Sequence, residues 1–127
     1  MSLESEVPSE PRYSVAIDRT PTDVTVSVIG EVDISNAGTL QERLMEAGSP
    51  EAAAVVVDLT KTEYLDSAGI RTLFTVLDLL RDRGTALHLV VPESAVIRRV
   101  IALTALDEAC PTWSNTAEAV EAAMNPT

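Results

Sequence analysis

The feature that most constrains the fold of this chain is its longest unbroken apolar run, residues 52–57, which is followed by Asp58 and Leu59. The run falls far short of the about 18 apolar residues that a membrane-spanning helix needs. Its lack of polar alternation is typical of a strand that is buried on both faces. We therefore expect this strand at the centre of a sheet.

Two apolar patterns upstream of that strand indicate an antiparallel hairpin. Residues 13–18 and 24–30 each alternate apolar with polar side chains, as half-buried strands do. The turn between them, residues 20–23, is short enough that the two strands should pair antiparallel. The acidic, proline-containing residues 1–11 are predicted to form a disordered tail, and the folded domain is predicted to span residues 12–124.

Helical signals alternate with strand signals through the rest of the chain. The first helix is predicted to begin at a cap on Ser35 or Asn36 and to end near Ala47. The second is predicted to begin at Asp66 or Ser67. Its apolar residues cover more than the single face of an ordinary amphipathic helix, which favours internal packing on two sides over contact with a partner. The second helix should end near residue 83, and the further elements are a strand over 87–91, a helix over 94–103, a short strand near 109–113 and a helix over 116–124.

This order of elements predicts an α/β fold. After the hairpin each crossover is strand–helix–strand, which makes a mostly parallel sheet. We expect a single domain with a central sheet of four to five strands, one antiparallel edge hairpin and about four helices. Functional sites in such sheets lie beyond the carboxyl ends of the strands, here residues 30–35, 60–69 and 92–94.

Composition excludes several classes of site. The chain has 20 acidic and 9 basic residues, a formal net charge of −11, so it should repel nucleic acid and anionic membranes. Its one cysteine, Cys110, cannot form an intramolecular disulfide, which suits the reducing cytoplasm. With only one histidine, His88, a Cys/His zinc site within one chain is impossible. We therefore expect a cytoplasmic protein with no cofactor or metal of its own.

A serine hydrolase is a disfavoured alternative. Ser67 lies where a strand passes into a helix, but a nucleophile elbow requires glycine two residues earlier, where this chain has Leu65. The only available base, His88, lies in mid-strand, where we expect a solvated or hydrogen-bonded residue that points away from the strand ends. The five glycines form neither of the common phosphate-binding patterns, so no nucleotide site is expected.

Ser67 is instead a candidate for phosphorylation, with helix capping as the plain alternative. Asp66 can cap the helix equally well, which would leave Ser67 free in the first turn. Ala68 and Gly69 are small, so the hydroxyl would be unshielded and the backbone of a partner could approach closely. The free N–H groups and the positive dipole end of a helix N-terminus can accommodate a phosphate.

Several segments of the chain resemble the STAS domain of bacterial anti-sigma-factor antagonists. The similar segments are Gly30-Glu31-Val32-Asp33, residues 55–60, Leu65-Asp66-Ser67-Ala68-Gly69-Ile70, residues 97–101 and Thr104-Ala105-Leu106. Together the similarity covers about residues 13–124, nearly the whole chain. The family often has glycine where this chain has Ala105, a departure that bears only on the local turn.

The resemblance implies a STAS fold and a partner-switching function. In the family, the unphosphorylated antagonist binds an anti-sigma factor that is itself an ATP-dependent serine kinase, and this binding releases the sigma factor. The kinase phosphorylates the motif serine, here Ser67, which abolishes the association, and a serine/threonine phosphatase resets the cycle. ATP and Mg²⁺ would belong to the partner, so the chain itself is not expected to be an enzyme.

The partner-binding surface is expected to combine the loops over residues 31–35 and 60–67 with the exposed side of the second helix. The predicted partner contacts are Glu31, Asp33, Ser35, Tyr64, Asp66, Ala68, Gly69, Arg71, Thr72 and Thr75. Thr60 and Thr62 are interpreted as structural hydroxyls, with their phosphorylation left open. Two other settings share the fold and remain alternatives: a component of a stress-sensing scaffold and a soluble subunit of a lipid transporter.

Overall fold

A computed structural model describes residues 13–21 and 23–124 of the 127-residue chain. In chain order its elements are β1 (Tyr13–Arg19), β2 (Asp23–Val32), α1 (Ala37–Ala47), β3 (Ala54–Asp58), β4 (Thr62–Leu65), α2 (Ser67–Asp82), β5 (Ala86–Val90), α3 (Arg98–Leu103), α4 (Leu106–Ala109), β6 (Thr112–Trp113) and α5 (Thr116–Met124). The tail predicted over residues 1–11 lies outside the described residues, as does residue 12.

The strands form one mixed sheet in the order β1-β2-β3-β5-β6, with β4 also paired to β2. Only the β1–β2 hairpin is antiparallel, and the other pairs are parallel. The predicted α/β fold with an antiparallel edge hairpin is therefore confirmed. The described part of the chain has six strands and five helices, slightly more than predicted.

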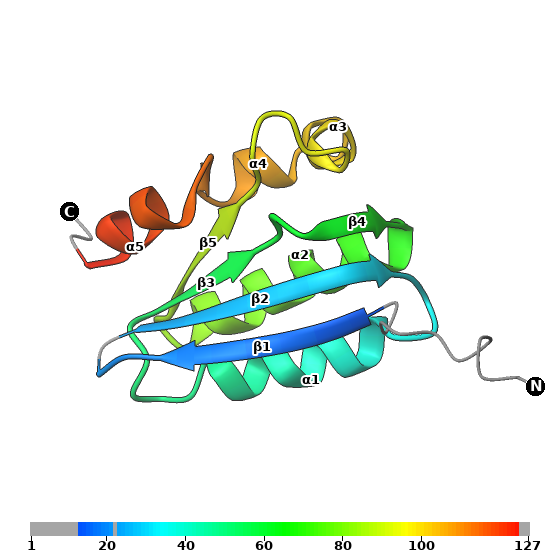
Figure 1. Cartoon of the computed structure of the whole chain (residues 1–127). Coiled ribbons are helices and arrows are strands. Elements are labelled where there is room, and N and C mark those ends of the chain that lie inside the picture. The colour runs from blue at the N-terminus through cyan, green and yellow to red at the C-terminus, as the bar shows by residue number, and fades with distance from the viewer. Residues whose placement is uncertain (1–12, 22, 125–127) are drawn as a thin grey trace, which may run out of the picture.

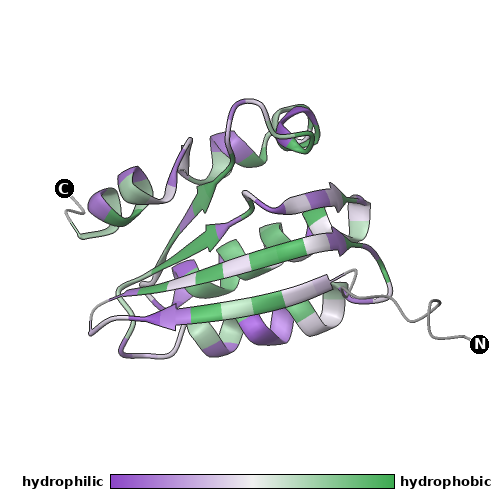
Figure 2. Ribbon diagram, in the orientation of Figure 1, coloured by the Kyte–Doolittle hydropathy of each residue, from purple (hydrophilic) through white to green (hydrophobic). Residues whose placement is uncertain are grey.

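The apolar run forms β3, which lies at the centre of the sheet as predicted. Val55 and Val57 belong to the main core between the sheet and helices α1 and α2, whereas Val56 packs with Ala119 of α5 on the other face. All three valines are fully buried. Figure 1 shows α1 and α2 on one side of the sheet and α5 on the other. Figure 2 shows apolar residues continuous along most of β3 but alternating with polar ones along β2.

The wide apolar stripe of α2 is used mainly for internal packing. Val76 is fully buried, Phe74 packs against the main core, and only Leu79, at 40% exposure, stands out of it. Within the described residues no helix is both long and apolar enough to cross a bilayer.

Strand β4 replaces part of the loop that the sequence predicts over residues 60–67. It pairs with the last residues of β2. Strand β3 pairs with the same edge of β2, but nearer the start of that strand. The hydroxyl of Thr62 fixes this arrangement by donating to the carbonyl of Val28 at 2.6 Å. The four residues of β4 pair with a strand that lies much earlier in the sequence. They therefore carry no strong strand pattern of their own.

The helix predicted over residues 94–103 begins only at Arg98, because the residues before it form turns that begin at Pro92. It ends at Leu103, and Ala105, which has φ 62° in the left-handed region, directly precedes a short separate helix, α4. Left-handed backbone favours glycine, since a Cβ is strained there. The departure from the family pattern at Ala105 therefore coincides with a strained turn.

Candidate functional site

Ser67 follows β4 and the β2–α1 loop follows β2, so both lie where two paired strands end. Val32 at the end of β2 is the register partner of Leu65 at the end of β4. The pairing extends one residue further, since the backbone N–H of Asp66 donates to the carbonyl of Val32 at 3.2 Å. The residues that follow each strand, among them Asp33 and Ser67, therefore lie at one edge of the sheet, on the right in Figure 1.

Ser67 is the first residue of α2, and its side chain is exposed. The cap is Asp66, whose Oδ1 accepts hydrogen bonds from the backbone N–H groups of Ala68 at 2.9 Å and Gly69 at 3.1 Å. The predicted division of roles is therefore present: the aspartate caps the helix, and the serine hydroxyl is not used for capping. A kinase could reach this hydroxyl from solvent.

Gly69, which the sequence predicts as a partner contact, is buried, and its missing side chain serves packing within the domain. A Cβ at this position would lie 2.6 Å from Leu65 Cδ1 and 3.0 Å from Val32 Cγ1. Both distances are far inside van der Waals contact, so the missing side chain is what lets the first turn of α2 approach β2 and β4. The absence of a side chain at Gly69 thus allows Ser67, two residues earlier, to lie close to the β2–α1 loop.

Thr72 was also expected on the exposed side of α2, and that expectation is wrong. Its side chain is only 7% exposed, and its hydroxyl donates to the carbonyl of Ala37 at 3.5 Å. Thr72 follows Gly69 by three residues, so both lie on the face of α2 that packs inward. The start of α1 covers it there.

The other predicted contacts remain accessible. Ser35, Tyr64 and Arg71 are exposed, and the half-buried residues of the set are Glu31, Asp33, Asp66, Ala68 and Thr75. Thr62 is buried, which confirms a structural role and removes it from a kinase's reach. Thr60 is exposed, but its hydroxyl donates to Asp58 Oδ1 at 2.5 Å within a local turn.

The β2–α1 loop is braced by its own polar side chains. Asp33 Oδ1 accepts from the backbone N–H of Ser35 at 2.9 Å and from its hydroxyl at 2.5 Å. Asn36 accepts from the backbone N–H of Asp33 at 3.0 Å and donates to the carbonyl of Glu31 at 3.0 Å. Asn36 occupies the N-cap position of α1, one of the two predicted, but its side chain is committed to these bonds and makes no cap bond to the helix.

The middle of this loop carries Ile34, which is 82% exposed and is not among the predicted partner contacts. The available signal was an aliphatic residue inside the turn-forming string Asp33-Ile34-Ser35-Asn36, where polar residues are usual. Tyr64, on β4, is 50% exposed at the same edge. The site thus combines one free hydroxyl with two exposed nonpolar side chains.

His88 cannot act as a base for Ser67. It is the chain's only histidine, it is buried beside Val56, and its Nδ1 accepts a hydrogen bond from Trp113 Nε1 at 3.0 Å. Its side chain shares the face of the sheet that α5 covers, whereas α2 covers the opposite face. Burial also lowers the pKa of His88, so the imidazole is neutral near pH 7. The expectation of a hydrogen-bonded strand histidine is confirmed.

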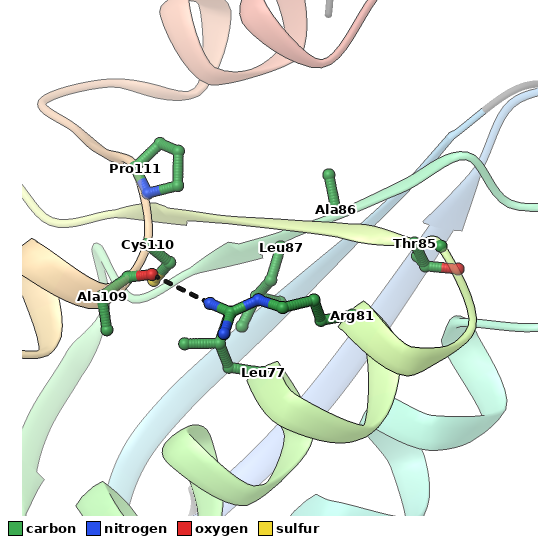
Figure 3. A pocket seen from close by; sticks show the side chains of 9 residues that line it. Leu77, Arg81, Thr85, Ala86, Leu87, Ala109, Cys110 and Pro111 are labelled. Atoms are coloured by element: carbon green, nitrogen blue, oxygen red, sulfur yellow. Dashed lines mark hydrogen bonds between the residues drawn. The ribbon is translucent and has the colours of Figure 1, made fainter.

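A pocket of about 370 Å³ lies at the opposite end of α2 from Ser67, between that end and the chain around Cys110. Figure 3 shows Arg81 reaching across it, where Nη2 donates to the carbonyl of Ala109 at 3.3 Å. Burial raises the pKa of Cys110 to about 11, so its thiol stays protonated and unreactive at neutral pH. No group of three or more potential metal ligands occurs within the described residues.

Comparison with known proteins identifies the family. The family model described as the STAS domain matches residues 14–119. The anti-sigma-F factor antagonist RsfB of Mycobacterium tuberculosis, found in two strains, is 32% identical over 84 residues. That alignment covers 65% of this chain and 66% of RsfB, slightly less than two thirds of the relative's length.

Solved structures agree with this assignment. The crystal structure of an anti-sigma factor antagonist from Mycobacterium paratuberculosis has a TM-score of 0.76 at 27% identity and covers 92% of this chain and 99% of its own. SpoIIAA, a Bacillus cell fate determinant in its phosphorylated form, has a TM-score of 0.61 at 14% identity, over 85% of this chain and 97% of its own, and supports the fold. On the extent of the family match and this structural agreement, the chain belongs to the STAS domain family.

Proposed function

We propose that this chain is an anti-sigma-factor antagonist, which in its unphosphorylated form binds an anti-sigma factor in the cytoplasm and releases a sigma factor. Family membership supports the proposal, as do the names of the mycobacterial relatives. The observation that carries it is Ser67, an exposed hydroxyl at the start of α2 whose capping task is done by Asp66. The chain acts by binding and catalyses no reaction of its own.

The anti-sigma factor is a serine kinase, and Ser67 is its substrate. Ser67 Oγ attacks the γ-phosphorus of ATP while the bond to the bridging oxygen of ADP breaks, and the hydroxyl proton passes to a base of the kinase. The kinase supplies ATP and Mg²⁺, and a serine/threonine phosphatase later removes the phosphate. The phosphorylated form of SpoIIAA supports this step, because a related fold carries the modification.

The fold tolerates the phosphate, whereas the interface does not. A phosphate on Ser67 adds about −1.5 to −2 charges at neutral pH. The N-terminal dipole of α2 offsets roughly 0.3–1 kcal/mol of the resulting repulsion within the domain. In the complex, the acceptor hydroxyl must lie beside the γ-phosphate of the nucleotide, so a phosphoserine faces the nucleotide's own phosphates. A charge left unmatched at an interface costs several kcal/mol, and about 4 kcal/mol lowers affinity roughly a thousandfold.

Phosphate mapping tests the proposal directly. The chain is incubated with ATP, Mg²⁺ and candidate anti-sigma factor kinases, beginning with the anti-sigma-F factor that RsfB is named for antagonising. Mass spectrometry is expected to find one phosphate, on Ser67, and none on a Ser67→Ala variant. Ser94→Ala, which removes an exposed serine in the loop before α3, serves as the matched control and should be phosphorylated normally. Phosphate on other residues only, or a Ser67→Ala variant modified like the wild type, would refute the switch.

A further inference from the structure

We propose that Ile34 is the apolar anchor of the partner-binding surface, entering a pocket on the anti-sigma factor that is rimmed by cationic side chains. This inference rests on the proposed function and deepens it. Ser67 decides whether the complex persists, and Ile34 supplies affinity that does not depend on the phosphate.

The first argument is the exposure of Ile34 in a braced loop. Its side chain is 82% exposed, although moving an aliphatic side chain out of water is favourable. The hydrogen bonds that Asp33 and Asn36 make across the loop hold the backbone on both sides of Ile34. A braced loop loses little backbone freedom on binding, so burial of its apolar side chain contributes more affinity than burial of the same side chain on a mobile loop.

The second argument is position. The β2–β4 pairing brings the loop that carries Ile34 to the edge where α2 begins with Ser67. Tyr64, half exposed on β4, adds a second nonpolar surface at that edge. A partner that covers both the start of α2 and the β2–α1 loop therefore contacts Ser67 and Ile34 together. Central aromatic or aliphatic anchors surrounded by polar residues are typical of protein interfaces.

The third argument is charge, and it gives the chemistry of the occupant. The same edge carries four carboxylates, on Glu31, Asp33, Glu63 and Asp66, and the whole chain has a formal net charge of −11. Electrostatic complementarity requires positive potential on the partner around the pocket that receives Ile34. The phosphorylated serine is still rejected, because it faces the phosphates of the nucleotide and not the cationic rim.

Binding and kinase assays on three variants test the anchor, with the kinase that phosphorylates Ser67 as the probe, beginning with the M. tuberculosis anti-sigma-F factor. Ile34→Ala should weaken binding at least about tenfold and raise KM for phosphorylation without changing kcat. Ile34→Leu should restore binding to within about threefold of the wild type. Met124→Ala is the matched control, because Met124 is 62% exposed on α5, which lies at the left of Figure 1 whereas β4 lies at the right. Loss of the Met124 side chain should change affinity less than about twofold.

Ionic strength separates the anchor from its charged surroundings. The loss caused by Ile34→Ala should be the same at low and high salt, because apolar contacts are not screened. Glu63→Gln should weaken binding at low salt only. An Ile34→Ala variant that matches the wild type in affinity and KM while Ser67 is still phosphorylated overturns the anchor and leaves the proposed function standing. A wild-type chain that is neither bound nor phosphorylated overturns both.

Discussion

Replacing Gly69 by alanine tests whether a missing side chain positions the phosphorylation site. The new Cβ would lie 2.6 Å from Leu65 Cδ1 and 3.0 Å from Val32 Cγ1, whereas ordinary contacts lie at 3.4–4 Å. Leu65 and Val32 are 4% and 0% exposed, so neither side chain can turn out into solvent without leaving the core. We expect the overlap to be relieved by moving the first turn of α2 away from β2 and β4.

The expected magnitude follows from two opposing effects. Overpacking a buried site costs typically about 1–3 kcal/mol. Alanine in place of glycine in a helix returns up to about 1 kcal/mol. These ranges combine to a fall of about 0–3 kcal/mol in the free energy of unfolding of Gly69→Ala, and at their midpoint of about 1.5 kcal/mol the Tm should fall by about 3–8 °C.

Gly38→Ala is the matched control, because Gly38 lies in the first turn of α1 and a Cβ there meets no atom within 4 Å. It should gain up to about 1 kcal/mol. Urea denaturation of both variants and the wild type measures the difference. If Gly69→Ala is as stable as Gly38→Ala, the close packing does not constrain the turn, and Gly69 returns to being a candidate partner contact.

Four further predictions follow from individual residues. Ser67→Asp should keep wild-type stability in urea denaturation but bind the anti-sigma factor at least about tenfold more weakly, as measured by calorimetry. Ser67→Ala should bind with wild-type affinity. Equal affinity of the two variants would contradict the charge switch. Ala105→Gly should raise the free energy of unfolding by about 1 kcal/mol, because φ at Ala105 is 62° and its side chain is exposed; an unchanged urea midpoint would mean that the turn is unstrained. Burial lowers the pKa of His88, so the unfolded chain binds the proton more tightly than the folded chain does. The free energy of unfolding should therefore fall as the pH drops below about 6.5. Urea denaturation at about pH 7.5 and 5.5 should show a smaller fall in His88→Gln than in the wild type. Because burial raises the pKa of Cys110 to about 11, iodoacetamide at pH 8 should modify the thiol only after unfolding, and rapid labelling of the folded chain by mass spectrometry would contradict its burial.

The parts of the fold that could be predicted are those whose signals are local. The central strand β3 was recognisable because burial on both faces leaves its run of valines uninterrupted. The start of α2 was recognisable because Asp66 is a strong capping residue placed directly before an apolar helical stripe. The start of α5 was recognisable from the Asn115–Glu118 pair, in which the backbone N–H of Glu118 donates to Asn115 Oδ1 at 2.9 Å.

The parts that could not be predicted depend on residues distant in sequence. Strand β4 exists because β2 runs on past β3 and offers a free edge, which its own four residues do not encode. Thr72 is polar in a mainly apolar helix and so indicates a solvent-facing position, yet the start of α1 covers it. Ile34 has the hydropathy of a core residue, and only the course of the loop shows that it faces solvent.

The same β2–β4 pairing explains how a phosphate could change binding without a change of fold. Ser67 projects from a helix start that is held by the Asp66 cap and by close packing at Gly69, and neither involves the serine hydroxyl. Adding a phosphate to Ser67 therefore breaks no hydrogen bond that holds the domain together. The loop that carries Ile34 is held by separate bonds within residues 31–37. Because the two halves of the surface are held by separate hydrogen bonds, phosphorylation of Ser67 should leave the conformation of the loop that carries Ile34 unchanged.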